Sequence, residues 1–317
     1  MHETTWGLPV ILYLFMAGLG AGALITSTSL LLRGGATGKY FNVARYGAFI
    51  APIPVILGSA LLVFELGSFQ AGNWFRFLNL YTVINLSPMS IGTWLLTIFL
   101  GVSIVYAYTF LSPDARPGDA QENLRRMTAW VGVPLGIGVA VYTGVLLGAL
   151  PARPFWNSPI LALLFLLSSI STGIAAVILA RAVMHRRQLS ANDEHEYHET
   201  GYLLSATDTL LIGLELLTLF LFLMYAHLSI GNTREAVGVI MFGGELSLMF
   251  WLWVVTIGLL IPASIELALI IPRLIHHGEY LSHRYIDIIV PVTVLIGGFM
   301  LRYVVLIAGQ ITFPIGL

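Results

Sequence analysis

Eight long apolar segments constrain the fold of this chain more than any other feature of its sequence. They cover approximately residues 8–32, 46–67, 90–111, 127–150, 159–184, 204–230, 246–271 and 287–312. A helix needs about 20 predominantly apolar residues to cross the hydrocarbon core of a bilayer, so each segment predicts a transmembrane helix. The composition agrees, because only 10% of the residues are charged, against about 25% in a soluble domain. We therefore predict an all-α integral membrane protein with eight transmembrane helices.

Basic residues are distributed unevenly over the connections between these segments. Eleven of the 15 Lys and Arg residues lie in or beside the connections after the first, third, fifth and seventh segments, and four lie on the other side: Arg76, Arg153, Arg234 and Arg302. Because basic residues concentrate on the cytoplasmic side, this asymmetry predicts that both termini lie outside. The start, "MHETTWG", has no basic region and indicates no cleavable signal peptide. We expect a multi-pass protein of a bacterial inner membrane, in contact with membrane lipids.

The first segment contains the stretch "FMAGLGAGALI", in which Gly18, Gly20 and Ala23 fit the dinucleotide-binding pattern. That pattern requires a preceding strand and an acidic residue about 20 positions further on. Here the glycines lie inside one apolar run, and no Asp or Glu occurs between positions 3 and 65. We interpret Gly18 and Gly22, one helical turn apart, as part of a small-residue stripe at which another helix or a flat ligand approaches the backbone.

Several kinds of site are disfavoured by the sequence. The chain has no Cys, so it holds no disulfide, thiolate metal site or iron–sulfur cluster. A membrane cytochrome b needs paired histidines within its helices, but only His227 lies near a membrane segment, so we expect no haem. The cluster of His276, His277 and His283 favours a solvated loop over a metal site, and we predict no metal on this chain. A net charge of -1 gives no indication of nucleic-acid binding.

Ionisable residues inside the apolar segments are candidates for function, because burying a charge in a bilayer is costly. One group is expected toward the outside, where it could line a polar pocket: Glu65, Glu245 and Arg302, with Tyr142 nearby. A second group is expected from the inner side toward mid-membrane and suits a proton relay or a cation path: Arg181, Asp208, Glu215 and Glu266. Asp208 and Glu215 are seven residues apart and share one helix face. The alternative is that ion pairs hold the helices together, such as Arg302 with Glu245 or Arg181 with Asp208.

Four stretches together resemble one known family. They read "WGLPVILYLFMAGLGAGA", "LLVFELGSFQAGNWFRFLNLYTVINLSPMSIGTWLL", "VYTGVLLGALPARPFWNSPILALLFLLSSISTG" and "GGFMLRYVVLIAGQ". Over nearly its whole length the chain resembles the NrfD/PsrC family, the membrane subunits of polysulfide reductase and related respiratory complexes. The resemblance implies two four-helix bundles, here residues 1–150 and 151–317, without haem. It implies a menaquinone or ubiquinone site near the outer face of the first bundle. It also implies two partners docked outside: a ferredoxin-like iron–sulfur subunit and a molybdopterin catalytic subunit.

Two site residues of the family match positions of this chain. The tyrosine that contacts the quinone matches Tyr142 in "VYTGVLL", and the acid at the outer end of the second helix matches Glu65 in "ELG", where the family commonly has Asp. On the first helix the family often places an amide or His side chain, whereas this chain reads "FMAG". A backbone group near Gly18 would take its place, and the small residues Gly18 and Gly22 would let a flat ring approach. Trp6 is expected at the membrane interface beside this site.

These observations predict a haem-free membrane subunit that exchanges electrons between a quinone and an iron–sulfur partner. Tyr142 would hydrogen-bond a quinone carbonyl, and Glu65 would take or give a proton at the outer face. A route for protons, in uptake or in pumping, would use Asp208, Glu215, Glu266, Arg181, Glu245 and Arg302. Two alternatives stay open: a proton-coupled transporter, and a passive anchor without bound quinone. Transporters often contain internal repeats, and no clear repeat is visible here.

Overall fold

A computed structural model describes residues 6–34, 38, 40–66, 78–82, 87–111, 120–184, 191–276 and 283–311, with the side chains of residues 64–66, 191–196 and 276 excepted. Every regular element in these residues is helical. In chain order they are α1 (Leu8–Gly34), α2 (Phe41–Ile50), α3 (Pro52–Leu66), α4 (Asn79–Thr82), α5 (Pro88–Tyr108), α6 (Ala120–Gly148), α7 (Pro159–Met184), α8 (Ala191–Leu228), α9 (Asn232–Ile240), the π-helix η3 (Met249–Leu260), α10 (Ile261–His276) and α11 (Ile286–Ile311).

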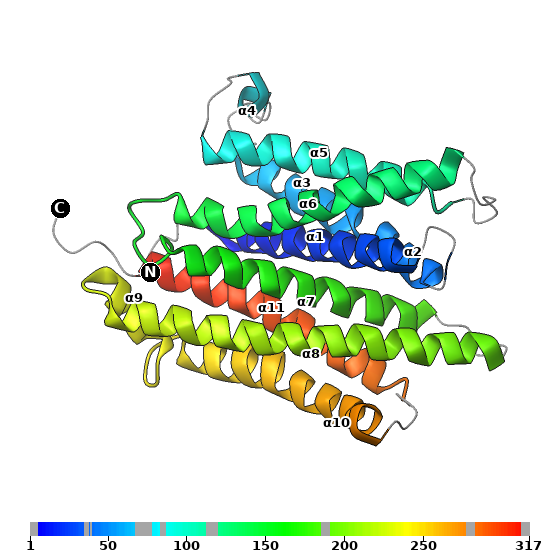
Figure 1. Ribbon diagram of the computed structural model, residues 1–317. Coiled ribbons are helices and arrows are strands. Elements are labelled where there is room, and N and C mark those ends of the chain that lie inside the picture. The colour runs from blue at the N-terminus through cyan, green and yellow to red at the C-terminus, as the bar shows by residue number, and fades with distance from the viewer. Residues whose placement is uncertain are drawn as a thin grey trace.

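Within the described residues, eight helical spans are long and apolar enough to cross a membrane, which confirms the predicted number. They lie side by side with their long axes in roughly one direction (Figure 1). We call the end at which α1 begins the Leu8 end, and the opposite one the Gly34 end. The α6–α7 connection and α9 lie at the Leu8 end, whereas α8 begins at the Gly34 end (Figure 1). That the Leu8 end faces outside stays a prediction from the distribution of basic residues.

Two of the spans are less regular than the sequence predicts. The second span is made of α2 and α3, which meet at Ala51, and α3 begins with a proline that suits the first position of a helix because it has no N–H to donate. The seventh span changes from the π-helix η3 to α10 at Ile261, directly before Pro262. Proline at this position cannot donate a backbone hydrogen bond, and the wider turn of a π-helix accommodates the missing bond.

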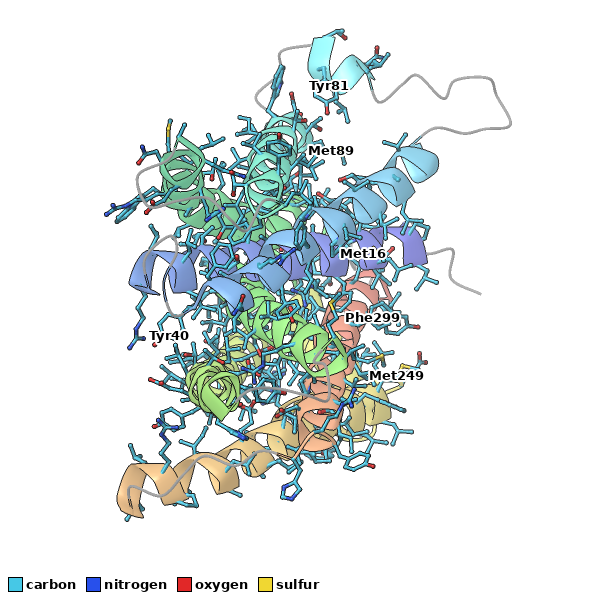
Figure 2. The ribbon with its side chains drawn as sticks, turned by 90° about the vertical axis from the view of Figure 1, so that its right-hand side faces the viewer. Met16, Tyr40, Tyr81, Met89, Met249 and Phe299 are labelled. Carbon is cyan, nitrogen blue, oxygen red and sulfur yellow. The ribbon has the colours of Figure 1, made fainter. Side chains whose placement is uncertain are left out.

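The connections between spans contain further helical residues. The charged stretch before the sixth span is helical from Ala191 onward, because α8 begins there and continues into the membrane segment. This stretch contains residues that favour a helix, such as Ala and Glu. The segment between the second and third spans lies mostly outside the described residues. Its described part includes the short helix α4, which carries Tyr81 at the edge of the molecule (Figure 2).

Helices α1 and α7 form the centre of the packing. Helix α1 contacts α2, α3, α6 and α7, and α7 also contacts α8 and α11. Gly22 and Gly173 face each other where α1 and α7 meet, and a β-carbon on either would overlap the backbone of the other helix. Small residues allow helix backbones to approach closely in membranes. Because α1 and α7 make the most extensive contact of all described elements, they join the two halves, and the division into two four-helix bundles stays a prediction.

At the Leu8 end, three segments far apart in the sequence are tied together. The ring of Trp6 stacks on Trp156 from the α6–α7 connection, with 5.7 Å between the ring centroids. The Gln310 side chain of α11 accepts from the Trp6 backbone N–H (2.9 Å) and donates to its carbonyl (3.0 Å). Trp156 Nε1 donates to the Val305 carbonyl (2.9 Å), and Arg153 donates to the Gln310 carbonyl (3.0 Å). These contacts fix Trp6 and the α6–α7 connection against the end of the last helix.

Candidate functional site

A buried arginine lies at the centre of the candidate site. Arg302 of α11 has 0% of its surface exposed. Its Nη1 donates to the Gly298 carbonyl (2.7 Å) and to Ser168 Oγ (3.2 Å), and its Nη2 donates to Ser169 Oγ (3.0 Å). Both serines belong to α7, so hydrogen bonds to its own helix and to one neighbour hold the guanidinium in place. Charged side chains are costly at this depth, and such bonds reduce that cost.

Helix α1 contributes a glycine and an aromatic ring to the surroundings of Arg302. A β-carbon at Gly18 would lie 2.7 Å from Nη2 of Arg302, so only glycine leaves room for the guanidinium. The Phe15 ring of α1 lies 5.7 Å from the guanidinium carbon, and the Phe165 ring of α7 lies 5.2 Å from it. Both distances are in the range of cation–π contacts. One turn after Gly18, Gly22 lies against the α7 backbone, so this face of α1 packs against protein.

The aromatic contacts of α1 continue onto α11. The Phe15 ring meets the Phe299 ring edge to face, with 5.7 Å between the centroids. Figure 2, in which the Gly34 end faces the viewer, shows Met16 of α1 and Phe299 of α11 on neighbouring helices near the middle of the molecule. The Arg302 site is therefore enclosed by apolar rings where α1, α7 and α11 meet.

The Glu215 side chain of α8 is connected to Arg302 through a serine. Glu215 is buried, with 3% of its surface exposed. The Ser168 hydroxyl accepts a hydrogen bond from Arg302 Nη1 and lies next to the Glu215 carboxylate. The carboxylate and the guanidinium also attract each other electrostatically. The sequence groups Arg302 with the outer residues, whereas the structure connects it to an acid of the inner group.

Two further buried acids extend this connection toward the Gly34 end. Asp208 lies two turns before Glu215 on α8 and accepts a hydrogen bond from Ser171 Oγ (2.6 Å). Glu266 of α10 accepts one from Thr209 Oγ1 (2.9 Å). Asp208 interacts electrostatically with both Glu215 and Glu266. The three predicted inner acids are thus brought together, and we call Glu266, Asp208 and Glu215 the acid series.

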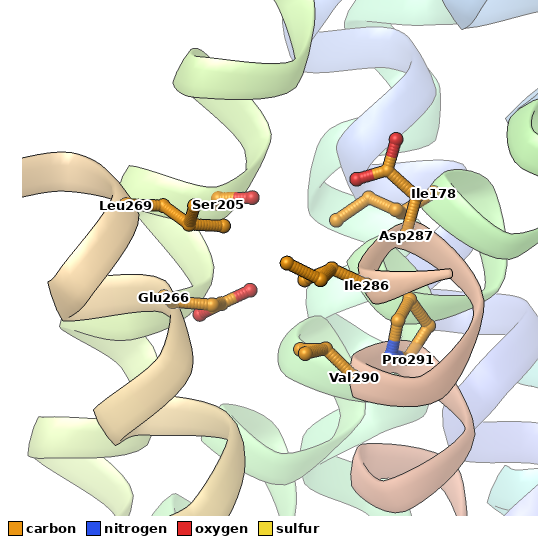
Figure 3. A pocket seen from close by; sticks show the side chains of 8 residues that line it. All are labelled: Ile178, Ser205, Glu266, Leu269, Ile286, Asp287, Val290 and Pro291. Carbon is orange, nitrogen blue, oxygen red and sulfur yellow. The ribbon is translucent and has the colours of Figure 1, made fainter. Parts of the chain in front are cut away.

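A small pocket lies beside the Glu266 end of the acid series (Figure 3). Its polar lining comes from Glu266 of α10, Ser205 of α8 and Asp287 of α11. The centre of a water-sized sphere can occupy about 10 Å³ inside this pocket. The pocket therefore has room for a water molecule. Asp287 is buried as well, and Tyr197 Oη donates to its Oδ2 (2.8 Å).

Arg181 of α7 lies beside this pocket cluster rather than beside Asp208. Its Nη1 donates to Thr200 Oγ1 (2.7 Å) and to the Tyr197 carbonyl (3.2 Å), both at the start of α8. Its guanidinium carbon lies 4.0 Å from the centroid of the Tyr197 ring. Arg181 is therefore held by hydrogen bonds to the Tyr197 carbonyl and the Thr200 hydroxyl of α8, and not by the suggested pair with Asp208.

The remaining acids of the predicted outer group lie elsewhere. Glu245 is exposed and lies in a turn before η3, whereas the sequence places it at the start of the seventh helix and in an outer polar pocket. The hydrogen bonds of Arg302 go to α7 and to its own helix, and the suggested pair with Glu245 is absent among the described contacts. Glu65 is the second-last residue of α3, and its side chain lies outside the part that the structure describes.

Tyr142 occupies a separate site in the first half of the chain. Its ring, on α6, fills the space above Gly92 of α5, where a β-carbon would overlap the ring and its hydroxyl. Tyr142 is 8% exposed, and the buried Tyr13 of α1 is near enough to interact with it electrostatically. Among the described residues, the Tyr142 hydroxyl has no hydrogen-bond partner.

Trp6, predicted beside a quinone, is half-buried and stacks on Trp156.

Several residues of the site are not predicted from the sequence. No role is predicted from the sequence for the serines of α7 or for Asp287, Tyr197 and Thr209. The run "SSIST" at 168–172 carries a signal, because consecutive hydroxyl residues in an apolar helix need partners on neighbouring helices. Asp287 is the first residue of the last apolar segment, where an acid is usually a solvated flank.

Comparison with known proteins assigns the chain to a family. The family model described as "Polysulphide reductase, NrfD" matches residues 1–314. One chain of the polysulfide reductase of Wolinella succinogenes is 30% identical over 98% of this sequence and 95% of its own length. Protein NrfD of Escherichia coli is 27% identical over 98% of this sequence and 96% of its own length. One subunit of the selenate reductase of Mesobacillus selenatarsenatis is 23% identical over 83% of this sequence and 66% of its own length. With a match over almost its entire length, this chain belongs to the polysulphide reductase NrfD family.

Proposed function

We propose that this chain is the membrane subunit of a respiratory redox complex in a bacterial inner membrane. It exchanges electrons between membrane quinone, either menaquinone or ubiquinone, and an iron–sulfur partner subunit, and it moves protons through the acid series. The names of two relatives, a chain of a polysulfide reductase and a subunit of a selenate reductase, support an assembly with a catalytic partner. In this assembly, the chemistry of the terminal substrate takes place on a molybdopterin subunit, whereas the reaction with quinone takes place on this chain.

The quinone half of the proposal rests on the Tyr142 hydroxyl. It makes no hydrogen bond with the described residues, so the phenol is available to donate to a quinone carbonyl oxygen, a bond worth about 1 kcal/mol. The neighbouring Tyr13 places a second phenol on the same side of α1. Because the face of α1 that carries Gly18 and Gly22 packs against α7 and Arg302, the quinone ring approaches α1 near Tyr13 instead. Glu65, at the end of α3, takes or gives the proton.

The proton half of the proposal rests on the continuity of the buried polar groups. From the Gly34 end, the acid series leads through Ser168 to Arg302. Carboxyl and hydroxyl groups can each take a proton from one neighbour and give one to the next. The fixed positive charge of Arg302 stabilises negative charge at that end of the series. Ionisable groups placed in this way inside a membrane are typical of proton relays.

The first experiment is purification of the tagged chain from its native membrane in mild detergent. We expect stoichiometric iron–sulfur and catalytic subunits by mass spectrometry, and bound quinone in the lipid extract. Electron transfer is then followed as reduction of the iron–sulfur clusters, by electron paramagnetic resonance, after addition of a reduced dimethylnaphthoquinone. A chain that purifies alone and without quinone would contradict the proposal and favour a transporter.

The variant Tyr142→Phe tests the quinone site within the assembled complex. We expect electron transfer from the quinol to slow by about tenfold, because one hydrogen bond of about 1–1.5 kcal/mol is lost. Tyr108→Phe is the matched control, because the Tyr108 side chain is 65% exposed on α5. Equal rates for the two variants, with assembly intact, would indicate that the chain is a passive anchor.

A further inference from the structure

The acid series needs a connection to water at the Gly34 end. Glu266 is the member that lines the pocket, yet only 2% of its surface is exposed. A group this buried exchanges protons with the solvent only through another titratable side chain or through water. The pocket beside Glu266 offers both, because Asp287 lines it from α11 and it has room for one water molecule.

We propose that Asp287 and the pocket water are the proton inlet of this subunit. Asp287 takes a proton from the aqueous phase at the Gly34 end and releases it to the water, which gives a proton to the Glu266 carboxylate. The inference rests on the proton half of the proposed function and adds the group through which that route begins. Figure 3 shows the Glu266 carboxylate and the Ser205 hydroxyl directed into the gap between α8, α10 and α11, with Asp287 beside it.

The lining of the pocket suits a single ordered water. Buried waters typically make about three hydrogen bonds, and Glu266, Ser205 and Asp287 supply three polar groups at this site. The rest of the lining is apolar and includes Leu269 and Val290. The pocket therefore offers a place for water beside both Asp287 and Glu266.

Neighbouring residues hold Asp287 in position. Tyr197 donates its hydroxyl proton to Asp287 Oδ2 in a 2.8 Å hydrogen bond. The Arg181 guanidinium covers the Tyr197 ring at 4.0 Å and is fixed by Thr200 Oγ1 at 2.7 Å. Arg181, predicted as part of a proton path, thus acts here as a positioning residue: it orients Tyr197, and Tyr197 orients Asp287.

The test uses the purified complex in liposomes that enclose a pH-sensitive dye. Electron transfer is started with a reduced dimethylnaphthoquinone, and protons moved per electron are measured for each variant. Asp287→Asn keeps the size of the side chain and its bond from Tyr197 but cannot carry a proton. We expect its proton-to-electron ratio to fall at least fivefold while quinol oxidation continues, and Asp287→Glu to restore most of the ratio.

A second variant and a control keep the result interpretable. Ser205→Val leaves Asp287 in place but removes one hydroxyl and fills the pocket, so it should cause the same loss of ratio. Glu122→Gln alters an acid in the first turn of α6, away from the pocket, and should behave as the wild type. Wild-type ratios in both Asp287→Asn and Ser205→Val would overturn the inference. Electron transfer without any proton movement in the wild type would instead overturn the proton half of the proposed function.

Discussion

Arg302 of α11 and Gly18 of α1 are in direct contact, and the contact leaves no room for a side chain at Gly18. A β-carbon there would lie 2.7 Å from Nη2 of the guanidinium and would also meet Ser169 Oγ. The first helix therefore helps to determine where the buried charge of the last helix lies. Since Arg302 is linked to Glu215 through Ser168, this contact couples the packing of α1 to the geometry of the acid series.

Gly18→Ala should displace the Arg302 guanidinium without preventing assembly, because the far end of an arginine side chain is flexible. We expect a loss of stability of about 1–3 kcal/mol, typical of overpacking, and a lower proton-to-electron ratio. The melting temperature in detergent and the liposome assay described above measure the two effects. The control is Gly101→Ala, because no atom lies within 4 Å of a β-carbon at that position. If Gly18→Ala keeps the melting temperature and the proton-to-electron ratio of the wild type, the contact between Gly18 and Arg302 does not fix the guanidinium.

Gly22→Ala should be more harmful than Gly18→Ala, although both replace a glycine of the same stripe. A β-carbon at Gly22 would overlap the backbone of α7 at Ser169, and backbone cannot rotate away as a side-chain end can. We expect little assembled complex, as measured by gel filtration of the tagged chain. Assembly of Gly22→Ala at the level of Gly18→Ala would show that α1 and α7 separate more easily than their contact indicates.

Removing the positive charge of Arg302 should leave the Glu215 carboxylate without its compensating partner. Leaving a buried charge uncompensated costs about 3–5 kcal/mol, so Arg302→Met should lower the melting temperature strongly. Adding Glu215→Gln to this variant should recover part of the loss, because no unpaired charge is then left. A double-mutant cycle of melting temperatures gives the coupling between the two residues. Additive effects would show that the pair is not linked through Ser168 as described.

Gly92→Ala should act on the quinone reaction from a helix that carries no titratable group of the site. Its methyl group would overlap the Tyr142 ring, so the phenol must move. We expect a fall of about tenfold in electron transfer from the reduced dimethylnaphthoquinone, comparable to the loss of one hydrogen bond. Gly138→Ala on α6 is the control, because its β-carbon would approach no closer than 3.5 Å to Leu95. An unchanged rate in Gly92→Ala would separate Tyr142 from quinone binding.

Trp156→Phe tests the connections at the Leu8 end. The substitution keeps an aromatic ring for the stack with Trp6 but removes the Nε1 donor to the Val305 carbonyl. We expect a loss of about 1 kcal/mol, the usual net value of one hydrogen bond, with some additional cost because the buried carbonyl is left without its partner. Thermal unfolding in detergent measures the loss, and an unchanged melting temperature would show that this bond does not hold α11 in place.

The eight spans and the family could be predicted from the sequence, because both depend on local properties of the chain. The length of an apolar run determines whether a helix can cross a bilayer, whatever its neighbours are. The same reasoning identifies Arg302, Asp208, Glu215 and Glu266, since an ionisable residue within an apolar run must be buried or face a polar interior. It fails at Glu245, which lies just before its helix and is exposed.

Only the tertiary structure decided which groups meet. The sequence groups Arg302 with the outer acids by its depth along α11, whereas the packing of α7 between α8 and α11 links it to Glu215 through Ser168. Asp287 became part of the site because α11 places it beside Glu266 of α10 and Tyr197 of α8. A sequence determines depth in the membrane residue by residue, but which faces of the helices oppose each other depends on close packing among all of them.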